Sequence, residues 1–133
     1  MNERNFHQQR VSEFTDYIRA TPQTQLAKFK EEVSESLDEH DKTGFSKEFA
    51  DELTDTIIIS IGLIHCMGLD FNKLFNDKME IAWEKYAEVP TLIEKGTSIP
   101  DALQTAKEKW NAKRMELQTI FESAQYDGEG NIL

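Results

Sequence analysis

The sequence predicts an all-α protein, with a four-helix-bundle core followed by one added C-terminal helix. Apolar residues recur at steps of three and four over most of the chain, which is the helical period. Glycine and proline are few, six and three in 133 residues, and most of them divide the periodic segments: Pro22, Gly44, Gly68, Pro90, Gly96 and Pro100. We therefore expect one domain over residues 1–126 and a flexible tail over residues 127–133.

The first helix is expected over residues 5–19, and the second begins at Pro22. Thr21 is the expected N-cap of the second helix, because its hydroxyl can accept a hydrogen bond from the first turn. Proline at the first helical position strengthens this start, since its missing N–H is not needed there. The second helix carries one apolar stripe, formed by Leu26, Phe29, Val33 and Leu37.

The third helix is expected to start after Gly44 with Ser46 as its cap, and to end at Gly68 in a left-handed conformation. From Ile57 to Ile64 this helix is apolar nearly all round. Such a helix needs cover on several sides, more than one small bundle provides. The sequence therefore predicts a homodimer or a dimer of dimers, with this helix at the interface.

Asp70 is expected to cap the fourth helix, which should turn an apolar face inward. A loop containing Pro90 and Gly96 should follow it. The accessory C-terminal helix is expected over residues 100–124.

The net charge is −10, from 25 acidic and 15 basic residues. This charge repels phosphodiester backbones and anionic lipid surfaces, so neither nucleic acid nor a membrane is an expected partner. The single cysteine, Cys66, cannot form an internal disulfide and fits a reducing cytoplasm. The N-terminal residues lack the apolar core of a signal peptide, and the run Ile57–Ile64 is too short to span a bilayer. A cytoplasmic location is therefore expected.

Two pairs of carboxylates are the main candidates for chemistry. Glu32 and Glu35 are three residues apart on the second helix, and Glu52 and Asp55 are three apart on the third. Residues at this spacing are neighbours on a helix surface, and a short connection makes successive helices antiparallel. Both pairs can then meet in one groove, where their repulsion would be relieved by a hard cation such as Mg²⁺ or Mn²⁺.

The stretch EEVSE, residues Glu31–Glu35, is followed after sixteen residues by ELTD, residues Glu52–Asp55. This pattern resembles the EExxE…ExxD signature of the MazG-like all-α nucleoside triphosphate pyrophosphohydrolases, and the resemblance covers residues 22–87. It implies a Mg²⁺-dependent hydrolase, with Mn²⁺ as a substitute, that releases pyrophosphate from a nucleoside or deoxynucleoside triphosphate. The implied metal ligands are Glu32, Glu35, Glu52 and Asp55. The implied catalytic residues are Glu35 and Glu31, and Glu31 would either support a metal ligand or orient the attacking water.

The resemblance also implies substrate contacts on the fourth helix, for which Lys78 and Lys85 are the candidates. Trp83 on the same helix is a candidate for stacking on the base. Relatives often carry an asparagine on this helix, where this chain has Ala82. This departure leaves open an inactive family member.

Two other functions compete with the hydrolase. A di-iron carboxylate bundle uses Glu-x-x-His pairs, and no glutamate in this chain is followed by a histidine three residues later. A non-catalytic acidic adaptor for a basic partner fits the net charge, and would not respond to Mg²⁺.

Overall fold

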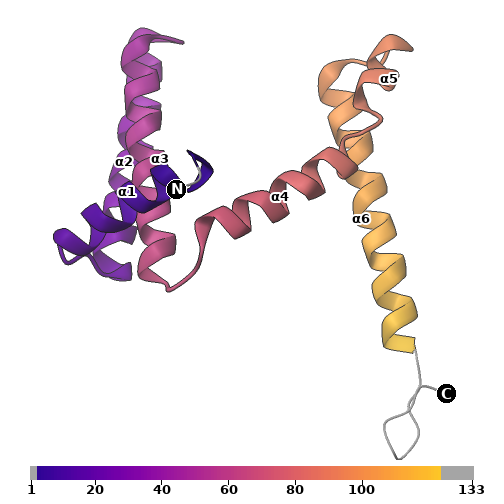
Figure 1. Ribbon diagram of the computed structural model, residues 1–133. Helices are drawn as coiled ribbons and strands as arrows, with labels where there is room; N and C mark the ends of the chain where they lie inside the picture. Colours follow the sequence, from indigo (N-terminus) through magenta and orange to yellow (C-terminus); the bar gives the residue numbers. More distant parts are fainter. Residues whose placement is uncertain (1–2, 124–133) are drawn as a thin grey trace, which may run out of the picture. The chain divides into compact units, whose positions relative to one another are not determined.

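The computed structural model describes residues 3–123, with side chains described for residues 6–117. Within residues 3–123 the chain forms helices and no strand, so the predicted all-α fold is confirmed (Figure 1). The predicted tail, residues 127–133, and the end of the predicted accessory helix lie outside the described residues. The helices are α1 (Glu3–Tyr17), α2 (Pro22–Thr43), α3 (Lys47–Cys66), α4 (Phe71–Lys85), α5 (Val89–Glu94) and α6 (Ile99–Ser123).

The chain divides into two compact units, Met1–Asn76 and Asp77–Leu133, and the division falls within α4. In the first unit, α2 packs along α3, and α1 packs on α3 (Figure 1). In the second unit, α5 packs on α6. The single domain expected over residues 1–126 stays a prediction.

Both predicted N-caps are confirmed. The Thr21 hydroxyl accepts a hydrogen bond from the backbone N–H of Thr24 at 3.2 Å, and Pro22 occupies the first turn of α2. The Ser46 hydroxyl accepts the N–H of Phe49 at 3.1 Å and begins α3. These two caps fix where the paired helices begin.

The C-terminal end of α3 also forms as expected. Gly68 has a φ of +76°, in the left-handed region that glycine adopts without a steric cost. The N–H of Leu69 donates to the carbonyl of Ile64 at 3.2 Å, and the N–H of Gly68 donates to the carbonyl of His65 at 2.9 Å. This is the Schellman arrangement, which satisfies carbonyls that the helix itself leaves free.

Asp70 caps α4 and joins its first turn to α1. Its carboxylate accepts the backbone N–H of Asn72 at 3.0 Å and the side-chain amide of Gln8 at 3.0 Å. The bond from Gln8 is the largest cause of a lowered pKa at Asp70, and the backbone N–H groups of the first turn of α4 add to it.

The expected loop around Pro90 instead contains a short helix, α5. Proline is tolerated in a first helical turn, and Pro90 stands at that position of α5. Gly96, with a φ of +98°, follows the helix and reverses the chain before α6.

The three helices of the first unit approach closely at Gly62. A side chain at this position would lie 2.7 Å from the Gln25 amide nitrogen and 2.9 Å from the Thr15 hydroxyl. Gln25 and Thr15 are themselves buried, at 2% and 3% exposure. Glycine at position 62 therefore lets α1 and α2 both reach the same turn of α3.

The buried apolar core is small. Among residues with described side chains it consists of Ile61, Ala102 and Ala106, and no large side chain is fully buried. Ile57 on α3 is 56% exposed. The expected inward face of α4 is open as well, since Phe75 is 51% exposed. In the single chain, many apolar residues of the helical stripes are therefore exposed, although their periodic spacing predicts that they are buried.

No single helix within residues 3–123 is long and apolar enough to cross a membrane. Only the bent combination of Lys47–Cys66 with Phe71–Glu94 meets the requirements of length and composition.

We predict that Gly62→Ala lowers the free energy of unfolding by roughly 1 kcal/mol or more, because overpacking costs about 1–3 kcal/mol. Helix propensity alone predicts the opposite sign, a gain of about 1 kcal/mol. Urea unfolding measures the change. In a Gln25→Ala background, which removes the nearest atom, the loss should shrink. A rise in stability on Gly62→Ala would contradict the close approach.

Candidate metal centre

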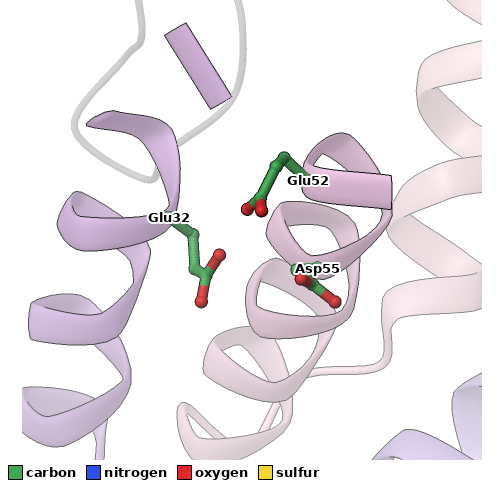
Figure 2. Close-up of side chains that lie close together, drawn as sticks. All are labelled: Glu32, Glu52 and Asp55. Atoms are coloured by element: carbon green, nitrogen blue, oxygen red, sulfur yellow. The ribbon is translucent and has the colours of Figure 1, made fainter. Parts of the chain in front are cut away.

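Three carboxylates gather where α2 runs along α3. Glu32 lies near the middle of α2, and Glu52 and Asp55 lie on successive turns of the first half of α3. One ligand oxygen from each carboxylate lies within 4.8 Å of the other two. Figure 2 shows Glu32 extending from its helix toward α3, where Glu52 and Asp55 are carried. The predicted meeting of acidic side chains from two helices is therefore present for these three residues.

Two of the carboxylate oxygens are buried without a partner. Oε2 of Glu32 and Oε2 of Glu52 are shielded from solvent, and neither has a hydrogen-bond partner. Both side chains are only half-buried as a whole. A buried charged oxygen without a donor or cation is costly, because it has lost its water and gained nothing in return. The arrangement therefore calls for a positive ligand between the two helices.

Electrostatics at the cluster lead to the same conclusion. Burial is the largest cause of a raised pKa at Glu32, followed by the negative charges of Glu35, Asp55 and Glu52. Burial also leads the causes of a raised pKa at Glu52, followed by the charges of Glu35 and Asp55. Each glutamate is thus held where its ionised form is disfavoured unless a cation joins the cluster.

The donor set suits a hard divalent cation. All three groups are carboxylate oxygens, which Mg²⁺ and Mn²⁺ prefer over nitrogen or sulfur ligands. Mg²⁺ takes six ligands and keeps several waters, so three protein carboxylates leave positions for water and substrate phosphate. The residues present therefore fit a bound Mg²⁺.

Of the remaining predicted residues of the acidic motif, Glu35 lies near the cluster. Glu35 is exposed, yet close enough for its charge to raise the pKa of Glu32 and of Glu52. The compact set of ligand oxygens contains Glu32, Glu52 and Asp55 but not Glu35. Glu31 is exposed on α2.

A pair of hydroxyls that the sequence analysis did not identify lies at the seam, that is, the line of contact between α2 and α3. Ser36 on α2 is 5% exposed, and its Oγ lies 3.1 Å from Oγ1 of Thr56 on α3. Oγ of Ser36 also lies 2.9 Å from the carbonyl oxygen of Glu32, and Oγ1 of Thr56 lies 3.1 Å from that of Glu52. Ser36 and Thr56 each follow a clustered glutamate by four residues, and this spacing places them on the same helix faces as Glu32 and Glu52. That spacing was the one sequence signal for the pair. The contact between them depends on how the two helices pair.

The predicted substrate contacts lie in the second compact unit. Lys78 is exposed on α4, and Trp83 is 77% exposed. The ammonium of Lys85 lies 5.2 Å from the centroid of the Tyr86 ring, a cation–π distance. Trp83 and Tyr86 help to line a shallow groove of about 180 Å³, together with Ala82.

A larger cavity, of about 700 Å³, lies in the first unit between α1, α3 and the first turn of α4. Its walls are mostly apolar and include Phe14, Ile57 and Phe75. None of the three clustered carboxylates lines it. The acidic cluster and this cavity therefore occupy different sides of α3.

Comparison with known proteins identifies the family of this chain. Residues 2–80 match the family model described as phosphoribosyl-ATP pyrophosphohydrolase, a span that includes α2, α3 and all three carboxylates. No curated protein and no solved structure matched the chain. The match covers more than half of the chain and confirms the resemblance to the MazG-like superfamily, to which the matched family belongs. The chain is a member of the phosphoribosyl-ATP pyrophosphohydrolase family, and thus of a family of hydrolases that act on phosphoanhydride bonds.

Proposed function

We propose that the chain is a Mg²⁺-dependent nucleotide pyrophosphohydrolase. Its substrate would be a nucleoside or deoxynucleoside triphosphate, or phosphoribosyl-ATP, which the family description names. The products would be the corresponding monophosphate and pyrophosphate. One observation carries the proposal: three carboxylates from two helices converge, and two of them bury an oxygen that has no partner.

The carboxylates of Glu32, Glu52 and Asp55 would hold the cation, and Glu35 would complete the set at its edge. Mg²⁺, when bound, neutralises phosphate charge and acts as a Lewis acid toward a phosphoryl oxygen. Mn²⁺ is the expected substitute, because it accepts the same oxygen ligands. The requirement for a cation also accounts for how a chain of net charge −10 can accept an anionic substrate.

The remaining acidic groups would orient and deprotonate the attacking water. Glu35 lies near the cluster, and Glu31 precedes Glu32 on α2; their carboxylates would orient the attacking water and accept its proton. The water oxygen forms a bond to the α-phosphorus while the bond from that phosphorus to the bridging oxygen breaks. The electron pair of the broken bond leaves with pyrophosphate. Positioning and charge compensation supply most of the acceleration in such reactions.

Substrate contacts from α4 complete the proposal. Lys78 and Lys85 would contact phosphates, and the exposed ring of Trp83 would stack on the base. Ala82 offers no amide at the position where relatives often have asparagine. We therefore expect these lysines and the aromatic ring to provide the binding that the asparagine provides elsewhere.

We further propose that the active form is a homodimer or a dimer of dimers with α3 at the interface. The apolar stripe of α3 supports this, because Ile57 is 56% exposed and Leu53 is 42% exposed in the single chain. A second copy that covers α3 would supply the burial that one chain lacks.

We predict that pyrophosphate is released from triphosphates only when Mg²⁺ or Mn²⁺ is present. Asp55→Asn should lower the rate at least about 100-fold, because it replaces a charged carboxylate of the centre with a neutral amide. The matched control is Glu48→Gln, which removes an exposed acid from the same helix but outside the cluster. A pyrophosphate-release assay over common triphosphates and phosphoribosyl-ATP, with circular dichroism of each variant, measures the effect.

Full activity in Asp55→Asn, or equal losses in both variants, would overturn the assignment of the centre. Indifference of the wild-type chain to Mg²⁺, with no substrate hydrolysed, would favour an acidic adaptor.

The raised pKa values of Glu32 and Glu52 predict a pH dependence of the metal-free protein. A carboxyl whose pKa is raised on folding is destabilising when charged, so its cost is absent below its unfolded pKa and complete above the folded one. In EDTA, the free energy of unfolding of the wild-type protein, compared with that of Glu52→Gln, should therefore fall as the pH rises through this interval. Added Mg²⁺ should abolish this pH-dependent loss. Urea unfolding across a pH series measures it. A relative stability that rises with pH would contradict the repulsion.

A further inference from the structure

The hydroxyls of Ser36 and Thr56 form a continuous chain of contacts between the backbones of two proposed ligands. The carbonyl of Glu32 lies 2.9 Å from Oγ of Ser36, which lies 3.1 Å from Oγ1 of Thr56. That atom in turn lies 3.1 Å from the carbonyl of Glu52. These contacts cross the seam between α2 and α3 and begin and end on residues of the acidic cluster.

A count of protons shows that this chain is satisfied in either direction. Two hydroxyls carry two protons, and three contacts are available to them. Ser36 can donate to Thr56 while Thr56 donates to the carbonyl of Glu52. Alternatively, Thr56 donates to Ser36 while Ser36 donates to the carbonyl of Glu32. In both of these arrangements one hydroxyl donates across to the other helix, so the hydrogen bond between α2 and α3 can form with either group as the donor.

The two side chains are also small, which lets the helices approach closely at this point. Ser36 is almost fully buried and Thr56 is half-buried, so water competes little for the bond between them. The carboxylates of Glu32 and Glu52 repel each other and would otherwise favour a wider seam. A fixed contact at the seam opposes that separation.

We propose that Ser36 and Thr56 are positioning residues that set the pairing of α2 and α3 so that the carboxylates of Glu32, Glu52 and Asp55 share one cation. This inference rests on the proposed metal centre. It adds the residues that hold the ligand set together and do not themselves bind the ion.

Removing one hydroxyl should not unfold the chain. In Ser36→Ala the Thr56 hydroxyl still donates to the carbonyl of Glu52, and in Thr56→Val the Ser36 hydroxyl still donates to that of Glu32. In neither variant is a buried donor left without an acceptor, so neither loses the free energy of unfolding that an unsatisfied buried group costs. The expected loss is in the geometry of the cation site, because supporting residues orient metal ligands.

The test is calorimetric titration of Mn²⁺ into the full chain, with melting temperatures measured alongside. Ser36→Ala and Thr56→Val should each weaken Mn²⁺ binding roughly 10-fold, as loss of a supporting group at a metal site does. The double variant should be little worse than either single one, since both remove the same bond. Thr56→Ser, which keeps the hydroxyl, should bind like the wild type.

Thr54→Val is the matched control. Thr54 is exposed on the same helix, its hydroxyl donates to the carbonyl of Ala50 at 2.8 Å, and it lines the cavity beside α1 and α4. It should leave Mn²⁺ affinity unchanged. Should Thr56→Val fail to fold, Thr56→Ala compared with Thr56→Ser provides the same contrast.

Wild-type affinity in both single variants, with the wild type binding Mn²⁺, would overturn the positioning role and leave the metal centre standing. Equal weakening in Thr54→Val would also overturn it. Absence of Mn²⁺ binding in the wild type would overturn the metal centre and this inference together.

Discussion

Like charges held close together at the seam between α2 and α3 are the constraint on which the rest of this structure depends. Glu32, Glu52 and Asp55 bring ligand oxygens within 4.8 Å of one another, and two of those side chains bury an unpartnered oxygen. Pairing α2 with α3 brings these carboxylates together, and their repulsion opposes the same pairing. The caps at Thr21 and Ser46 fix where the helices begin.

The packing on either side of the acidic cluster can be understood in these terms. Gly62 admits the buried side chains of Gln25 and Thr15, so α1, α2 and α3 meet at one turn. The hydroxyls of Ser36 and Thr56 join α2 to α3 beside the carboxylates. Polar and small residues thus supply the specific contacts of the first unit. Its large apolar side chains stay substantially exposed in the single chain, which is the physical basis for expecting a second copy.

Local features and the meeting of acidic side chains from α2 and α3 were predictable from the sequence, whereas the other contacts between these helices were not. The caps of α2 and α3 follow from residues within a few positions of the helix start, so Thr21 and Ser46 were sufficient signals. The acidic pairs could be located because spacing of three residues determines a shared helix face. The contact of Ser36 with Thr56 depends on the relative register of two helices, which no local pattern specifies. The short helix α5 was missed because Pro90 was interpreted as a loop signal, whereas proline also suits a first helical turn.

The match to a family of phosphoanhydride hydrolases and the convergence of carboxylates support one account, in which the acidic cluster is a cation site. Manganese anomalous diffraction from crystals grown with Mn²⁺ tests this most directly, because it locates the ion without reference to activity. The account predicts one ion bonded to oxygens of Glu32, Glu52 and Asp55. An ion bound elsewhere, or these carboxylates turned apart toward solvent with no ion between them, would contradict it.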